Sequence, residues 1–246
     1  MENPTNRTAI VTGASRGIGA AIARRLAADG LNVVVNYASN QTAAQTVVDE
    51  IKAGGGRAVT AKADVSDPAQ VVQLFEAAQG AFGGVDILVN NAGIMKLASI
   101  AQSDDALFDG QVAVNLKGTF NSLREAARRL RDGGAIVSFS SSVVGLKLET
   151  YGVYAGIKAA TEVMTSILAK ELRGRAITVN AVAPGPTATD LFLEGKPQEV
   201  VDRMAKMPPL ERLGTPADIA SVVAFLTGPD GAWINGQTIR ANGGIV

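Results

Sequence analysis

Short β-branched segments alternate with longer Ala-rich segments along the whole chain, and this alternation restricts the fold more than any other feature. Runs of four to eight residues rich in Val, Ile and Thr are typical of buried strands, whereas the segments between them have helical spacing of apolar residues. Strict alternation of this kind produces right-handed βαβ crossovers. We therefore predict an α/β fold with a seven-stranded, doubly wound parallel sheet and helices on both faces. Strands are expected at 8–12, 32–36, 57–62, 86–90, 135–140, 176–183 and 237–241, and helices in segments such as 17–28, 40–53, 67–82, 104–130 and 152–172.

The chain is long enough for one large domain. It has 246 residues, of which 47% are hydrophobic, and no linker, repeat or low-complexity tract interrupts the pattern. We expect a single domain over residues 1–246. The segment 184–215 is irregular, rich in Pro and dotted with Gly, and its part at about 187–215 is long enough to form a lid over a substrate.

Charge and residue usage exclude several classes of function. Lys plus Arg equals Asp plus Glu at 23 each, so no basic excess favours nucleic acid or an anionic membrane surface. No apolar run reaches the length of a membrane-spanning helix and no leader is evident, so we expect a cytoplasmic protein. The absence of Cys and His excludes disulfides, thiolate nucleophiles, imidazole bases and zinc sites built from these residues. No metal is expected, and acid–base chemistry must use Tyr, Lys, Asp or Glu.

A glycine-rich turn joins the first expected strand to the first expected helix. The sequence TGASRGIG places Gly13, Gly17 and Gly19 there, spaced G-x-x-x-G-x-G. Gly13 permits a sharp turn, Gly17 allows close approach of a pyrophosphate to the backbone, and Gly19 allows tight packing of the helix on the sheet. Since the helix N-terminus favours negative charge, this turn predicts dinucleotide binding, although the glycines could serve packing alone.

The end of the second strand discriminates between the two nicotinamide dinucleotides. An acidic residue there would bind the ribose diol of NAD. This strand instead ends in Asn36, Tyr37, Ala38 and Ser39, with no carboxylate to repel a 2′-phosphate, and Arg16 in the glycine turn can supply a cation. We expect NADP(H) over NAD(H), although Arg16 could also be an ordinary solvated charge.

The stretch YGVYAGIK contains two of the three tyrosines in the chain. On a helix, Tyr154 and Lys158 lie on one face, a turn apart, while Tyr151 projects elsewhere. A nearby ammonium favours the ionised form of a phenol, so Lys158 is expected to lower the pKa of Tyr154. The alternative is an ordinary amphipathic pair on a surface helix.

Several motifs in order resemble the short-chain dehydrogenase/reductase family, in its classical subfamily. They are TGASRGIG (12–19), NNAG (90–93), Asn115, SFSSS (138–142), YAGIK (154–158) and PGPTAT (184–189). The resemblance covers essentially the whole chain and is greatest to the group of 3-oxoacyl-[acyl-carrier-protein] reductases and glucose 1-dehydrogenase-like enzymes. It implies a Rossmann fold and hydride transfer between a nicotinamide and a carbonyl or alcohol carbon.

The resemblance also implies the catalytic residues. Tyr154 would be the general acid or base, Lys158 would lower its pKa and bind the nicotinamide ribose, and Asn115 would anchor a water that passes protons to solvent. Ser141 would hold the substrate carbonyl, because it stands at the position that strand register and the distance to Tyr154 favour. The following S-V-V-G instead matches Ser142, so the choice between the two serines is open.

The cofactor would be bound by residues from six segments. By resemblance Asp64 and Val65 contact adenine, Asn91 to Gly93 lie beside the adenine ribose, and the segment after the sixth strand contacts the carboxamide. Asp64 could instead belong to the start of a helix. The implied cofactor-binding residues are Gly13, Ser15, Arg16, Gly17, Ile18, Gly19, Asn36, Tyr37, Ala38, Ser39, Asp64, Val65, Asn91, Ala92, Gly93, Tyr154, Lys158, Pro184, Gly185, Thr187 and Thr189.

The substrate is expected to be a small ketone, aldehyde or alcohol. A mostly apolar pocket is expected from Met95, Leu97, Val144, Leu146, Tyr151 and residues 187–206, which favours a hydrophobic carbonyl compound over a free sugar. The alternatives are a sugar dehydrogenase, an epimerase or dehydratase with tightly bound nicotinamide, and a catalytically silent regulator that binds NADP(H). The resemblance also implies a homotetramer.

Overall fold

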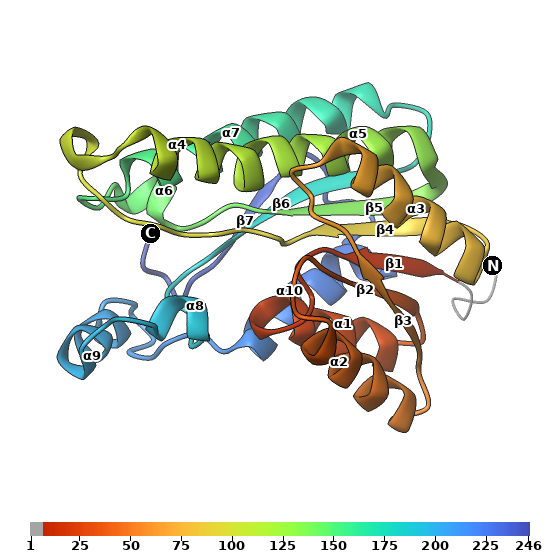
Figure 1. Cartoon of the computed structure of the whole chain (residues 1–246), viewed down its shortest axis with the longest axis horizontal. Helices are drawn as coiled ribbons and strands as arrows, with labels where there is room; N and C mark the ends of the chain where they lie inside the picture. Colours follow the sequence, from red (N-terminus) through yellow and green to blue (C-terminus); the bar gives the residue numbers. More distant parts are fainter. Residues whose placement is uncertain (1–6) are drawn as a thin grey trace.

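All seven strands form one parallel sheet, in the order β3-β2-β1-β4-β5-β6-β7 (Figure 1). The computed structural model describes residues 7–246, so the first six residues of the predicted domain lie outside the described part. The doubly wound α/β fold is therefore confirmed. The strands are β1 (Thr8–Val11), β2 (Asn32–Tyr37), β3 (Arg57–Lys62), β4 (Val85–Asn90), β5 (Leu130–Phe139), β6 (Thr178–Pro184) and β7 (Thr238–Ala241).

Helices cover both faces of the sheet (Figure 1). On one face lie α1 (Gly17–Ala28), α2 (Gln41–Ala53) and α10 (Pro216–Thr227), and on the other lie α3 (Pro68–Phe82), α5 (Gly118–Arg129) and α7 (Gly152–Glu171). The shorter elements are η2 (Ile100–Gln102), α4 (Asp105–Gln111), η3 (Val112–Lys117), α6 (Val143–Leu146), α8 (Asp190–Leu193), α9 (Gln198–Lys206) and η4 (Pro229–Gly231).

The two hydrophobic cores follow from the two-residue period of the strands. In β2, Val33 and Val35 pack under α1 and α2, whereas Val34 points to the opposite core with α3 and α5. In β4, Ile87 belongs to the core under α1 and α2, and Leu88 belongs to the opposite core. Since a parallel sheet is covered on both faces, its central strands carry apolar residues at consecutive positions, which is the pattern that identified them.

The expected helix over 104–130 is interrupted. The structure has α4, then a π-helical segment η3, then α5. A π turn contains one more residue per hydrogen-bonded ring than an α turn, and it commonly marks a functional position. Here it contains Asn115, whose side chain is completely buried. Apolar periodicity does not distinguish the two kinds of turn, so the helical segment was expected but its π-helical part was not.

The irregular segment after β6 contains two short helices, α8 and α9, which lie beyond the carboxyl ends of the strands (Figure 1). It is followed by α10, which was not among the helices named from the sequence. Thr215 and Asp218 form a reciprocal capping box at the start of α10, and Pro216 occupies its first turn. This capping signature is readable in the sequence and could have identified the helix.

The strand order changes direction at β1. The chain proceeds from β1 outward through β2 to β3, then returns to the other side of β1 with β4. Open α/β sheets bind ligands outside the carboxyl ends of the strands at such a switch point. Among residues 7–246, no helix has the length and apolar character needed to cross a membrane.

Candidate active site

The glycine turn lies at the carboxyl end of β1, at the switch point. Gly13 and Gly17 have positive φ angles of 62° and 57°, a conformation that favours glycine. A Cβ atom on Gly19 would lie 2.5 Å from the Gly13 carbonyl oxygen and 2.6 Å from Nδ2 of Asn91. Asn91 donates from the same nitrogen to the carbonyls of Thr12 and Gly13 at 2.9 and 3.2 Å. Only glycine at position 19 therefore permits this packing.

A cavity of about 360 Å³ extends from the glycine turn along the ends of β1, β2 and β4. No side chain caps the N-terminus of α1, so its first backbone N–H groups are available to an anion. The cavity is lined by these residues predicted to bind the cofactor: Gly13, Ser15, Arg16, Gly17, Ile18, Gly19, Asn36, Tyr37, Ala38, Ser39, Asp64, Val65, Asn91, Ala92, Gly93 and Thr189.

Six further residues line this cavity and were not among the predicted cofactor-binding residues. Asn40 and Ile94 directly follow predicted segments, so extending those segments by one residue would have found them. Ala63 likewise precedes Asp64. Asp190 and Leu191 directly follow Thr189 and fall in the segment 187–206 predicted for the substrate pocket, whereas Val114 had no signal of its own.

Two of the four predicted residues at the end of β2 have side chains committed to the protein itself. Asn36 accepts a hydrogen bond from the Gly13 backbone N–H at 3.1 Å and donates to the carbonyls of Ala61 and Ala63. Tyr37 packs in the core with 6% of its surface exposed. Their side chains therefore hold the turn and the strand in place. Ala38 and Ser39 are exposed and line the same cavity. The end of β2 carries no carboxylate there.

Asp64 lies at the edge of the same cavity, after β3. Its Oδ1 accepts hydrogen bonds from the backbone N–H and the hydroxyl of Ser66, at 2.9 and 2.8 Å. The side chain thus stabilises the turn before α3, as the helix-start alternative suggested, and still borders the cavity. Val65 packs against Gly118, where an added Cβ would lie 2.6 Å from its methyl group.

A second cavity, of about 160 Å³, adjoins the first. Ile18, Asn91, Gly93, Ile94, Thr189 and Leu191 line both cavities, so the two form one continuous site. The second cavity is mainly apolar and is closed on one side by the segment of α8 and α9. Of the predicted pocket residues, Met95, Leu146, Tyr151, Thr187, Thr189, Leu191, Phe192 and Met204 line it.

Of the predicted segment 187–206, only the five residues named above line this cavity, and two of the individually predicted residues, Leu97 and Val144, do not line it. Leu97 is 36% exposed and lies on the loop before η2, and Val144 lies on the side of α6 away from the cavity lining. The neighbouring Val143 lines the cavity instead, because the short helix α6 turns that residue inward. Ile245 from the C-terminus also lines it, and no sequence signal connected that residue with the pocket.

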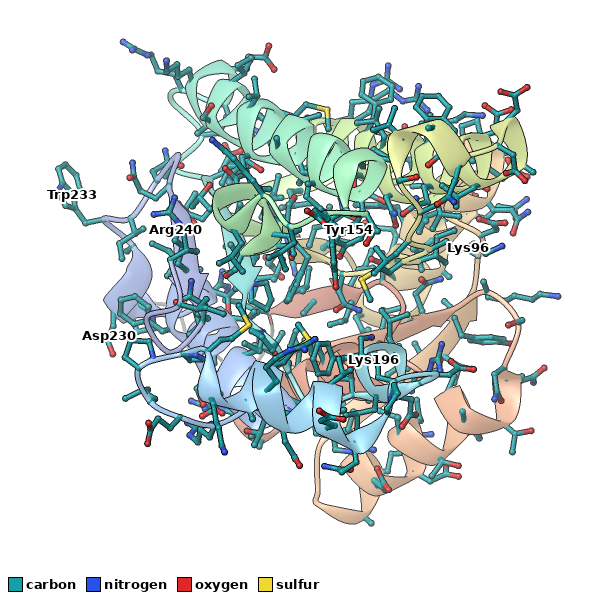
Figure 2. All side chains as sticks on the ribbon, turned by 90° about the vertical axis from the view of Figure 1, so that its left-hand side faces the viewer. Lys96, Tyr154, Lys196, Asp230, Trp233 and Arg240 are labelled. Atoms are coloured by element: carbon teal, nitrogen blue, oxygen red, sulfur yellow. The ribbon has the colours of Figure 1, made fainter. Side chains whose placement is uncertain are left out.

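Tyr154 and Lys158 share one face of α7, and both line the second cavity. Lys158 Nζ lies 5.6 Å from the centroid of the Tyr154 ring. The same nitrogen donates a hydrogen bond of 2.7 Å to the Phe139 carbonyl at the end of β5. In Figure 2, Tyr154 lies between the layer that contains α7 and the segment that carries Lys196. The two side chains therefore lie together at the second cavity.

The expected lowering of the Tyr154 pKa by Lys158 is not found in the protein alone. Burial, with a smaller contribution from Tyr151, raises the pKa of Tyr154 to about 12. Burial also lowers the pKa of Lys158 to about 8. As pH rises, the lysine therefore titrates before the phenol. Tyr154 remains protonated at neutral pH, in the state that an acid requires.

The two candidate serines have different surroundings. Both line the second cavity, but only the Ser141 side chain hydrogen-bonds Tyr154, which offsets part of the rise in the Tyr154 pKa. The Ser142 hydroxyl is buried, donates to the Ala183 carbonyl at 3.2 Å and accepts from Asn242 Nδ2 at 3.0 Å. Ser142 thus links β6 to the C-terminal segment, whereas Ser141 is placed beside the phenol.

Asn115 lines neither cavity. Its Oδ1 accepts from the backbone N–H of Ile94 at 2.8 Å, and its Nδ2 donates to the carbonyl of the same residue at 2.8 Å. The side chain therefore has its amide committed to the loop after β4. An added Cβ on Gly93 would lie 3.0 Å from Asn115 Oδ1 and 3.9 Å from Lys158 Nζ, so these groups converge behind the loop.

The segment after β6 joins the two cavities. Pro184, Gly185 and Thr187 line the second cavity, and Thr189 lines both. The Thr187 hydroxyl donates to the Gly185 carbonyl at 2.9 Å, and Thr189 caps α8 by accepting from the Phe192 backbone N–H. Within residues 7–246, no cluster of three Asp or Glu side chains forms a metal site.

Comparisons with known proteins agree with this arrangement. Residues 13–246 match the family model described as enoyl-(acyl carrier protein) reductase. A short-chain type dehydrogenase/reductase of Picea abies is 49% identical, over 98% of this chain and 92% of that protein. A protein of Arabidopsis thaliana named NADPH-dependent aldehyde reductase-like protein, chloroplastic, is 46% identical, over 98% of this chain and 94% of that one.

A solved structure has the same fold over almost its entire length. It is a short chain dehydrogenase from Burkholderia cenocepacia in complex with NADP, with a TM-score of 0.93 and 40% identity, covering 99% of both chains. Matches of this extent, together with the paired cavities and the Tyr154–Lys158 face of α7, identify the relationship. The chain belongs to the short-chain dehydrogenase/reductase family of oxidoreductases.

Proposed function

We propose that the protein is an NADP(H)-dependent carbonyl reductase that converts a hydrophobic aldehyde or ketone into the alcohol. The observation that carries the proposal is the protonated phenol of Tyr154 in an apolar cavity that is continuous with the larger cavity at the glycine turn. The balanced reaction consumes one carbonyl compound, one NADPH and one proton, and it releases the alcohol and NADP⁺.

The residues of the larger cavity fit NADP(H). The uncapped N-terminus of α1 and the positive-φ glycines provide backbone N–H groups for a pyrophosphate. The exposed Arg16 is the one cation that lines this cavity among the described residues, and it lies opposite Ala38 and Ser39. Arg16 would attract a 2′-phosphate, and no carboxylate at the end of β2 would repel it. The relatives named for NADPH and NADP support this preference.

The bound nicotinamide would supply a hydride from its C4 atom to the carbonyl carbon. Tyr154 donates its phenolic proton to the carbonyl oxygen as negative charge develops there, and Ser141 donates a hydrogen bond to the same oxygen. Lys158 Nζ, which donates to the Phe139 carbonyl, lies 5.6 Å from the centroid of the Tyr154 ring. Asn115 fixes the loop that carries Gly93 and Ile94, which form the wall common to both cavities.

The lining of the smaller cavity points to an uncharged, apolar substrate. Lys158 is the one charged side chain among its described lining residues, and that lysine is engaged by Phe139. Met95, Met204 and Met207 also line it, and flexible thioether side chains adapt to substrates of different shape. Burial of an aromatic ring in such a cavity would stabilise binding by several kcal/mol, on the order of 25 cal/mol per Å².

NADPH oxidation over a panel of carbonyl compounds tests this proposal. We expect turnover of benzaldehyde, acetophenone and larger aromatic ketones, weak or no turnover of glucose, and lower kcat/KM with NADH. Preference for an acetoacetyl thioester would assign the protein to the 3-oxoacyl reductases instead. NADPH binding without oxidation by any member of the panel would favour the silent regulator, and co-purified nicotinamide would favour an epimerase or dehydratase.

We also propose a homotetramer. Exposed apolar side chains support it: Phe108 of α4, Phe120 of α5, and Val163 and Ile167 of α7 lie on one helical layer. Trp233 is 98% exposed near β7, the edge strand, and Figure 2 shows it projecting from the molecule. Two separate apolar surfaces are what two kinds of twofold interface require. A cytoplasmic location remains our prediction, which localisation of the tagged full chain would test.

A further inference from the structure

Three ionisable residues of α7 form one stripe along the helix. Tyr154, Lys158 and Glu162 follow one another at intervals of four residues, so they lie on the same face, a turn apart. The first two belong to the proposed machinery. Glu162 is half-buried, lines neither cavity and has no role in the mechanism described above.

Each residue of the stripe contacts the carboxyl end of β5 or the residues that follow it. Tyr154 is beside Ser141, and Lys158 Nζ donates to the Phe139 carbonyl at 2.7 Å. Glu162 Oε1 accepts a hydrogen bond of 2.5 Å from the hydroxyl of Ser140. Ser140, which Glu162 contacts, therefore lies between Phe139 and Ser141 in the sequence.

The contact of Glu162 with Ser140 has the features of a strong hydrogen bond. Ser140 is only 3% exposed, so water competes little for its hydroxyl. Hydrogen bonds to a carboxylate are shorter and roughly twice as strong as those between neutral groups. The Ser140 oxygen also lies 3.4 Å from the carbonyl of Lys158, which further ties it to α7. Ser140 is thus the point at which the helix holds the end of the strand.

We propose that Glu162 is a positioning residue for the active site. By holding Ser140 it fixes the position of α7 along β5, and this sets both the Ser141 hydroxyl relative to Tyr154 and the Phe139 carbonyl relative to Lys158. The inference rests on the proposed reductase function for its kinetic part. A displacement of about 1 Å at a reacting group can lower the rate about 100-fold, so a contact of this kind affects turnover without touching substrate.

Substitutions on both sides of the hydrogen bond test the proposal. Glu162→Ala and Ser140→Ala remove it, Glu162→Gln keeps an oxygen acceptor, and Glu171→Ala, an exposed residue at the end of the same helix, is the matched control. With acetophenone and NADPH, we expect both alanine variants of the contact to lose about 10-fold in kcat. We expect Glu162→Gln to stay within about threefold of wild type and the control to be unchanged.

Two readouts distinguish positioning from loss of structure. NADPH affinity should stay within about twofold in all variants, because neither residue lines the larger cavity. The deuterium isotope effect on kcat with C4-deuterated NADPH should rise in the alanine variants, since a misplaced phenol slows the chemical step. Wild-type kcat in Glu162→Ala, an unchanged isotope effect, or a Glu162→Gln variant as slow as Glu162→Ala would overturn the proposal.

A crystallographic comparison does not depend on turnover. We expect Glu162→Ala to displace the Ser141 hydroxyl from Tyr154, and Glu162→Gln to leave it in place. An unmoved Ser141 in the alanine variant would overturn the inference. Absence of NADPH oxidation by the wild-type protein over the whole panel would instead overturn the proposed function, and the structural comparison would still decide whether Glu162 positions Ser141.

Discussion

At the scale of single residues, neighbouring side chains of similar chemistry have different tasks. Ser140, Ser141 and Ser142 are consecutive and all line the second cavity, yet the first contacts Glu162, the second hydrogen-bonds Tyr154, and the third joins β6 to the C-terminal segment. The sequence placed a serine at the site but left two choices open. The choice between the two serines depends on the backbone path after β5, where the strand gives way to the short helix α6.

Alanine substitutions separate the two serines experimentally. Ser141→Ala should lower kcat about 100-fold or more, because it removes a hydrogen bond to the developing oxyanion, and should leave stability nearly unchanged. Ser142→Ala should lower the free energy of unfolding by about 1 kcal/mol and keep most of the turnover. Urea unfolding and NADPH oxidation measure the two effects. The reverse pattern would make Ser142 the catalytic serine.

Lys158 makes stability depend on pH in a defined direction. Its pKa is lowered to about 8 by burial, so between about pH 8 and 10.5 the unfolded chain binds this proton and the folded protein does not. Stability from this group therefore rises with pH over that window. The difference in unfolding free energy between wild type and Lys158→Met should grow in favour of wild type from pH 8 to 10, by on the order of 2 kcal/mol.

Comparison with Lys158→Met is necessary, because Tyr154 acts in the opposite direction at higher pH. Its raised pKa of about 12 keeps the proton on the folded protein where the unfolded chain has lost it, so stability from Tyr154 falls above about pH 10. A wild-type minus Lys158→Met difference that stays flat between pH 8 and 10 would contradict the burial of a titrating amine at this position.

At the scale of elements, the join between β1 and α1 depends on glycine at specific positions. Gly19→Ala should cost about 1–3 kcal/mol of stability and weaken NADPH binding, since the new methyl group would overlap the Gly13 carbonyl. Gly80→Ala in α3 is the matched control, because that glycine is exposed and no atom lies within 4 Å of the added Cβ. The control should gain about 0.5–1 kcal/mol from helix propensity.

Thermal unfolding and an NADPH titration of both variants provide the measurement. Equal effects of the two substitutions, or full NADPH affinity in Gly19→Ala, would indicate that the turn tolerates a side chain. The account of the glycine turn as a close backbone approach would then be wrong.

Strands and most helices were predictable because each has a local signal. β2 and β4 carry apolar residues at successive positions, and α1 begins at the glycine turn, so their bounds agree with expectation within a residue or two. The π turn around Asn115 was not predictable, because it changes no apolar spacing. The position of Asn115 relative to Ile94 depends on that turn, so its actual contacts were also beyond sequence reasoning.

The pKa shifts of the site residues could not be predicted without the fold. The spacing of Tyr154 and Lys158 correctly indicated that they share a face, but the direction of the Tyr154 pKa shift depends on how completely the helix is covered. Burial disfavours the charged form of each group, so it raises the pKa of the acid and lowers that of the base. The cavity residue Ile245 shows the same limit, since only the folded chain brings the C-terminus to α6.

At the scale of the whole molecule, exposed apolar surface on the helical layer supports the proposed tetramer. Ile167 is 48% exposed and Val163 is 57% exposed on α7. Ile167→Asp should lower the assembled mass measured by light scattering, because a carboxylate would be buried without a partner. Lys52→Asp on α2, on the opposite face of the sheet, should leave it unchanged. A monomeric wild-type protein, or an unaltered mass for Ile167→Asp, would contradict the proposal.

The central claim is that the phenol of Tyr154 delivers the proton during carbonyl reduction. The most direct measurement is single-turnover NADPH oxidation by Tyr154→Phe, with Tyr151→Phe as the control and NADPH affinity measured in parallel. We predict a fall of about 100-fold or more in the rate of hydride transfer by Tyr154→Phe, with NADPH affinity kept within several-fold. A near-normal rate in that variant would remove Tyr154 from the chemistry and contradict the account.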